Sequence, residues 1–190
     1  MQIDRVLYPI TSLGPGNRLV IWTIGCSLGC YNCSNPELWS INPNKDISVD
    51  DLINAITQAT EGIQVDGITI TGGNPIEQSK ELAQLLPLLS EITDDILLFT
   101  GYKYEELNKY LSETEHDVIN KYVSVLIDGT YIDELNDNIC PLQGSSNQNI
   151  IFINENKKPL YSDYLKKGRT IQNVFYNNSM ISVGIHNKEL

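Results

Sequence analysis

The chain has 190 residues and a mass of 21.3 kDa, and its 41% hydrophobic side chains fit one globular domain with a sizeable core. With 13 lysines and arginines against 24 aspartates and glutamates, the net charge of −11 would repel nucleic-acid phosphates and anionic membranes. No apolar run approaches the roughly 20 residues that cross a bilayer, and the first residues lack the pattern of a secretory signal. We therefore expect a cytoplasmic protein without nucleic-acid or membrane partners.

The first half of the chain predicts alternating strands and helices. A strand is expected over residues 19–24, an apolar run that ends at Gly25, and an irregular loop with three cysteines follows it. Ser48 then caps a predicted helix that ends near Gly62. A short strand over residues 68–71 closes on Gly72 and Gly73, and a helix over about 77–90 comes next.

The alternation continues with a strand over 96–99, a helix over 104–111 and a strand over 122–127. Such alternation predicts a parallel sheet covered by crossover helices. Beyond a loop at 144–148, the last forty residues carry a strand-like run at 150–153 and a turn at 157–159, and two apolar runs there predict a hairpin around 174–185. We expect a core domain over residues 1–150 and a C-terminal extension over residues 151–190 that packs on it.

The cysteines are unevenly distributed. Cys26, Cys30 and Cys33 fall within eight residues, and Cys140 lies more than a hundred residues away. This pattern is typical of a metal or redox site and differs from a disulfide framework. Three thiolates on one loop suit an iron–sulfur cluster, or a zinc ion if a fourth ligand joins them. In a [4Fe–4S] cluster, three protein ligands leave one iron open to a substrate. Cys140 is interpreted as a small buried residue, although a role as fourth ligand stays open.

Five segments carry a resemblance to a known family. The stretch GPGNRLVIWTIGCSLGCYNCSNPELW resembles the N-terminal signature of the radical S-adenosylmethionine activating enzymes. The segments TITGGNP, FTGYKYEEL, VLIDGTYIDEL and GSSNQ resemble further motifs of that family in the same order, over about residues 7–150. The set is most similar to the branch that activates anaerobic ribonucleotide reductase. Two positions depart from the family pattern: Asn32 replaces an aromatic residue before Cys33, and Asn74 replaces an acidic residue after the double glycine.

The resemblance implies a fold and a set of cofactors. The fold is an α/β partial, open radical SAM barrel of about six strand–helix units with a mostly parallel sheet, followed by the hairpin-like extension. The cofactors are a [4Fe–4S] cluster on Cys26, Cys30 and Cys33, and S-adenosylmethionine at the open iron. Glycines at a strand end would let the backbone approach the methionine group closely. The expected cofactor-binding residues are Asn32, Cys33, Ser34, Thr71, Gly72, Gly73, Asn74, Thr100 and Asp128.

The resemblance also implies an activity, with no catalytic residue beyond the cluster and its cofactor. Reductive cleavage of S-adenosylmethionine yields methionine and a 5′-deoxyadenosyl radical, which abstracts hydrogen to install a glycyl radical on a partner enzyme. The expected partner is the large subunit of an anaerobic ribonucleotide reductase, and the expected reductant is a flavodoxin- or ferredoxin-type protein. Two alternatives stay open: a radical enzyme that modifies a peptide or small metabolite directly, and a non-catalytic iron–sulfur or zinc-binding electron carrier. The glycine motif argues against the carrier.

Overall fold

The computed structural model describes residues 1–188 and consists of one six-stranded sheet, four α-helices and a separate two-stranded hairpin. In spatial order, the sheet contains β1 (Ile3–Ile10), β2 (Arg18–Thr23), β3 (Gly67–Gly72), β4 (Ile96–Phe99), β5 (Val125–Asp128) and β6 (Asn149–Phe152). The helices are α1 (Val49–Ala59), α2 (Ser79–Leu89), α3 (Glu113–Tyr122) and α4 (Lys158–Leu165), and the hairpin is formed by β7 (Gln172–Tyr176) and β8 (Ser179–Val183). Strands β2 to β5 are parallel, whereas the edge strands β1 and β6 pair antiparallel.

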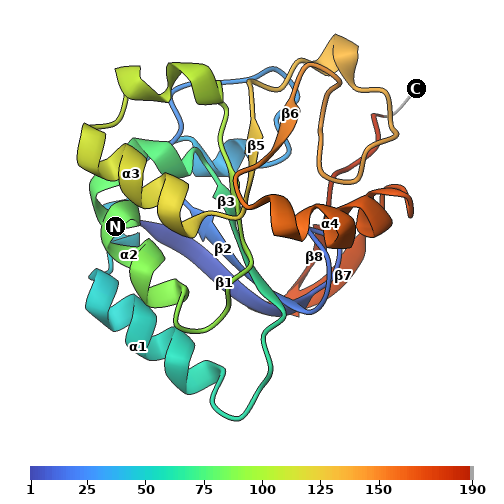
Figure 1. The fold of residues 1–190 in the computed structure, drawn as a ribbon. Coiled ribbons are helices and arrows are strands. Elements are labelled where there is room, and N and C mark those ends of the chain that lie inside the picture. The colour runs from blue at the N-terminus through green and yellow to red at the C-terminus, as the bar shows by residue number, and fades with distance from the viewer. Residues whose placement is uncertain (189–190) are drawn as a thin grey trace.

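The sheet is covered on both faces (Figure 1). Helices α1, α2 and α3 lie on one side, and α4 and the β7–β8 hairpin lie on the other. Strand β2 shows why: Leu19 and Ile21 belong to the core under the three helices, while Val20 and Trp22 alternate toward the hairpin. Parallel strands are usually apolar on both faces and need cover on each. Helix α4 and the hairpin supply much of that cover for the second face, together with buried residues of connecting segments such as Leu13, Leu38 and Leu142.

A buried ion pair connects α4 to the sheet at the N-terminal ends of the parallel strands. Arg18 Nη1 donates to Asp95 Oδ2 at 2.7 Å, and the Tyr161 hydroxyl donates to Asp95 Oδ1 at 2.8 Å. Arg18 Nε also donates to Thr69 Oγ1 at 2.7 Å. Burial raises the pKa of Tyr161 well above its usual value, so the hydroxyl keeps the proton that it donates. Buried charges are tolerated only when they are paired and hydrogen-bonded in this way.

The predicted parallel α/β core is confirmed, but a radical SAM barrel is not. Three helices connect four parallel strands, fewer than the expected six or so strand–helix units. The reason lies at the two edges, where β1 and β6 join the sheet through segments without an α-helix and therefore pair antiparallel. The result is an open sheet in the described residues.

Two local predictions were wrong. Residues 104–111 do not form an α-helix, because Tyr104–Lys109 is a 3-10 helix, and the helix between β4 and β5 is α3. A capping box in which Ser112 and Glu115 bond each other's backbone N–H begins α3. The expected turn at 157–159 is the start of α4, where Pro159 occupies the first helical turn and its missing N–H costs nothing. The predicted hairpin is confirmed.

No helix within residues 1–188 is both long and apolar enough to cross a membrane.

Candidate metal and cofactor site

The three clustered cysteines and the ends of the parallel strands meet at one edge of the sheet. Parallel strands place their C-terminal ends together, and ligands of α/β folds bind at such an edge. A cavity at this edge is lined by Cys26, Leu28, Cys30, Cys33, Ser34, Asn35, Thr71, Gly72, Gly73, Asn74, Phe99, Thr100, Gly101, Gly129, Tyr131, Gly144, Gln148 and Ile185. These residues come from the cysteine loop, from the ends of β3 and β4, from the segment between β5 and β6, and from the C-terminal extension.

Backbone hydrogen bonds fix the start of the cysteine loop. The N–H of Gly25 donates to Leu38 O at 2.8 Å, and the N–H of Cys26 donates to Trp39 O at 3.0 Å. From the other side, the N–H of Asn74 donates to Gly25 O at 2.8 Å. The loop is therefore held between the segment that follows it and the end of β3.

Glu77 anchors the same loop through one carboxylate oxygen. Its Oε1 atom accepts hydrogen bonds from the N–H and the hydroxyl of Ser27, both at 2.8 Å, and from the Tyr102 hydroxyl at 3.2 Å. Burial raises the pKa of Tyr102, so this hydroxyl remains a donor. In the sequence, Glu77 indicates only the start of a helix, because its contact with Ser27 joins residues 50 positions apart.

The three thiols are free and half-buried. Burial raises the pKa of Cys26 and of Cys30, and this effect is opposed by backbone N–H groups, those of Leu28 and Gly29 at Cys26 and that of Tyr131 at Cys30. The N–H of Asn35 lies 3.5 Å from Cys33 Sγ. Because the metal-free thiols at Cys26 and Cys30 hold their protons, iron must displace those protons when it binds.

The donor set of the cavity fits a cluster with one open iron. It contains three thiols and, among the residues that the structure describes, no fourth cysteine and no His, Asp or Glu. No three His, Cys, Asp or Glu side chains within residues 1–188 are gathered so that they could hold a single metal ion. In a cubane cluster each thiolate binds a different iron atom. The three sulfur atoms therefore need to face the same cavity but need not surround a single metal ion.

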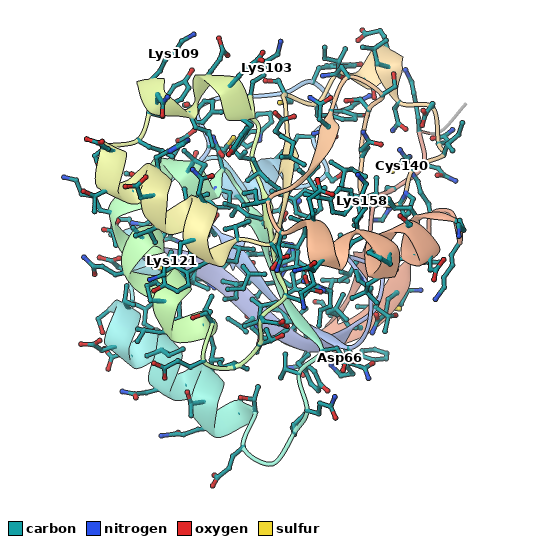
Figure 2. All side chains as sticks on the ribbon, in the orientation of Figure 1. Asp66, Lys103, Lys109, Lys121, Cys140 and Lys158 are labelled. Carbon is teal, nitrogen blue, oxygen red and sulfur yellow. The ribbon has the colours of Figure 1, made fainter. Side chains whose placement is uncertain are left out.

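Cys140 lies outside this cavity. Figure 2 labels it above α4, and its carbonyl oxygen accepts a hydrogen bond from Arg169 Nε at 3.0 Å. Its side chain is only partly buried, so the interpretation of Cys140 as a small buried residue holds in part, and its place outside the cavity gives no support to a role as fourth ligand.

The two glycines at the end of β3 allow the strand to approach the cysteine loop. A Cβ atom on Gly73 would lie 2.4 Å from Gly25 O, and one on Gly72, which has a φ of +110°, would lie 2.4 Å from Thr23 O. From the sequence, these glycines were expected to make room for the methionine group. In the structure, their missing side chains are first required by the backbone that leads into Cys26.

Most of the expected cofactor-binding residues line the cavity, namely Cys33, Ser34, Thr71, Gly72, Gly73, Asn74 and Thr100. Two do not. Asn32 lies in a neighbouring cavity with Asp133 and Lys188. The Asp128 carboxylate accepts hydrogen bonds from the N–H of Tyr104 at 2.7 Å and from the side chain of Asn149 at 2.8 Å. Contact of any of these residues with a cofactor stays a prediction.

Sequence reasoning missed the wall that follows β5. Gln148 organises this wall, because its amide oxygen accepts from the N–H of Gly144 at 2.7 Å and its amide nitrogen donates to Gly129 O at 2.7 Å. The GSSNQ motif contains Gln148 and was the available signal. Leu28, Phe99 and Tyr131 lie within the other quoted segments but were not singled out there. Ile185 lies outside all five segments, and only the tertiary fold brings it to the cavity.

Comparisons with known proteins agree with this donor set. Residues 12–151 match the model of a family described as a 4Fe-4S single cluster domain. The chain is 32% identical over 150 residues to the anaerobic ribonucleoside-triphosphate reductase-activating protein of Escherichia coli K12, a match that covers 74% of this chain and 92% of the relative. The protein of the same name from Enterobacteria phage T4 is 30% identical over 136 residues, which is 69% of this chain and 81% of the relative. The pyruvate formate-lyase-activating enzyme of Staphylococcus epidermidis is 39% identical over 75 residues, which is 38% of this chain and 30% of the relative.

Proposed function

The chain belongs to the 4Fe-4S single cluster domain family and is a relative of the anaerobic ribonucleoside-triphosphate reductase-activating proteins, and from this premise we propose that it installs a glycyl radical on such a reductase. The resemblance seen in the motifs is confirmed by these matches, and the chain is a radical S-adenosylmethionine activating enzyme. The observation that carries the proposal is that the three cysteines and the double glycine share one cavity.

In this proposal, Cys26, Cys30 and Cys33 would hold the cluster, and the iron without a protein ligand would be free to bind S-adenosylmethionine. When bound, the cluster and its cofactor supply a one-electron cleavage that gives methionine and a 5′-deoxyadenosyl radical able to take hydrogen from a glycine. The chain's own residues bind and orient the cofactor. The Thr100 hydroxyl donates to Asn74 Oδ1 at 2.9 Å, so the ends of β3 and β4 are fixed relative to each other beside the cavity.

The chain also excludes water from the reacting groups. The apolar side chains of Leu28, Phe99 and Ile185 line the cavity from three different segments. Exclusion of water protects a reactive intermediate from side reactions. A partner's glycine-bearing loop would close the remaining opening, and binding energy from the docked surfaces would hold the glycine near the reacting carbon. The electron would come from a flavodoxin- or ferredoxin-type donor.

The proposal is tested by assaying cofactor cleavage. The protein is reconstituted with iron and sulfide under anaerobic conditions, the cluster is reduced with dithionite, and methionine and 5′-deoxyadenosine are quantified by chromatography. We expect both products, in equal amounts, from the wild-type protein and neither from Cys30→Ala. A wild-type protein with a full, reduced cluster that forms no 5′-deoxyadenosine would contradict the proposal and favour an electron carrier.

A further inference from the structure

The C-terminal extension contributes a strap to the site, which we define as residues 184–188. Ile185 lines the cavity of the three thiols. A second cavity beside it is lined by residues 182–186 of β8 and the strap together with Ser34, Thr71 and Phe99. The strap therefore lies against the cavity of the three thiols.

The strap is held at three points. Ser12 Oγ donates to Val183 O at 2.7 Å just before it begins. Arg169 Nη1 donates to His186 O at 2.9 Å. At its end, Lys188 Nζ lies 2.8 Å from Asp133 Oδ2.

Arg169 also holds a second wall of the cavity. Its side chain is only 4% exposed. In addition to His186 O, its guanidinium donates to the backbone oxygens of Cys140 at 3.0 Å, Gln143 at 2.7 Å and Gly144 at 3.3 Å. Gly144 itself lines the thiol cavity, as does Ile185 next to His186. One buried guanidinium thus connects the wall after β5 to the strap.

We propose that Arg169 is a positioning residue for S-adenosylmethionine: by bonding two of the walls of the cofactor site, Arg169 fixes the distance between them. This inference rests on the proposed function. To that function it adds Arg169, a residue that lies outside residues 12–151, the part of the chain that matches the family model. The planar guanidinium has five N–H donors in a fixed fork, whereas a lysine ammonium has three donors at one point. Lysine can therefore keep the charge but cannot reach both walls with the same set of bonds.

The test is a titration of the reduced, reconstituted protein with S-adenosylmethionine, in which the change in the electron paramagnetic resonance spectrum of the cluster reports binding. We expect Arg169→Gln to weaken cofactor affinity by about tenfold or more, because a site whose walls are no longer preorganised must be ordered on binding. The cofactor affinity of the Arg169→Lys protein should lie between that of Arg169→Gln and that of the wild type. Iron content per chain should be unchanged in both variants.

Tyr161→Phe is the matched control. It removes the hydrogen bond from the Tyr161 hydroxyl to Asp95, which holds α4 of the same extension at the sheet edge opposite the cavity. The substitution should lower thermal stability without changing cofactor affinity. Ile185→Ala, which leaves Arg169 intact, gives a second measure: it should also weaken cofactor binding, and this result would carry the inference if Arg169→Gln does not fold.

Wild-type affinity in a folded Arg169→Gln protein, or in Ile185→Ala, would overturn the inference and leave the proposed function intact. A wild-type protein whose reduced cluster shows no spectral response to S-adenosylmethionine would overturn both.

Discussion

Substitution of Gly73 by alanine tests how closely the end of β3 must approach the cysteine loop. The new Cβ would lie 2.4 Å from Gly25 O and 2.9 Å from Gly25 C, both backbone atoms that cannot rotate away. Ordinary contact distances exceed this separation by about 1 Å, so the two segments must move apart. The hydrogen bond from the N–H of Asn74 to Gly25 O, 2.8 Å long, would be stretched by the same movement.

The magnitude follows from these two effects. Overpacking costs about 1–3 kcal/mol, and the weakened hydrogen bond about 1 kcal/mol. A loss of about 3 kcal/mol in the free energy of unfolding corresponds to a fall in Tm of about 6–12 °C for a domain of this size. Because Gly25 directly precedes Cys26, we also expect the variant to take up less iron and sulfide per chain on anaerobic reconstitution.

Circular dichroism of the metal-free protein gives Tm, and chemical analysis gives iron and sulfide. The control is Gly62→Ala, where φ is +72° and no atom lies within 4 Å of the new Cβ. This backbone strain costs about 1–2 kcal/mol but should leave the iron content unchanged. A Gly73→Ala protein with wild-type Tm and a full cluster would refute the reasoning. A full cluster with lost cofactor binding would instead place the role of Gly73 at the methionine group, as the sequence pattern alone suggested.

Three further predictions follow from the site and the core. Alanine at any one of the three cluster cysteines should abolish the cluster, while Cys140→Ala should retain it; loss of iron in the Cys140 variant would contradict a three-ligand site. Tyr161→Phe removes a hydrogen bond to the buried Asp95 carboxylate, which should lower the free energy of unfolding by about 2 kcal/mol. The Tm measured by calorimetry should then fall by about 4–8 °C. An unchanged Tm would show that α4 is not part of the cooperative unit. Glu77→Gln keeps a side-chain oxygen that can accept the hydrogen bonds of Ser27, but it removes a negative charge beside Cys26. The reduction potential of the cluster, measured by redox titration, should therefore become more positive. A more negative potential would contradict this placement of the carboxylate.

The parallel part of the fold could be predicted because its strands are short apolar runs that end at glycines, as in β3, and because α1 has a capping serine before an apolar helical pattern. Strand β1 was missed, since its burial is mostly partial and its pattern mixes charged and apolar residues. Helix α3 was missed because Ile119 is its one fully buried residue among those described, although its capping box was visible in the sequence.

The candidate site was predictable where its residues lie near the C-terminal ends of strands or within motifs, as for Thr71 and the three cysteines. Glu77 and Arg169 could not be found in this way. Each acts by bonding a segment distant in the sequence, Ser27 for the first and the loop around Gln143 for the second. Such contacts depend on how the elements pack, and no local pattern marks them.

Electron paramagnetic resonance of a mixture of this protein, S-adenosylmethionine, a reductant and the candidate anaerobic ribonucleotide reductase tests the proposed activity most directly. We expect a glycyl doublet on the reductase that requires both the cofactor and the intact cluster, and that is absent with the Cys30→Ala protein. Transfer of deuterium from a labelled peptide or metabolite into 5′-deoxyadenosine, with no protein radical formed, would exclude activation of the reductase and identify an enzyme that modifies its substrate directly.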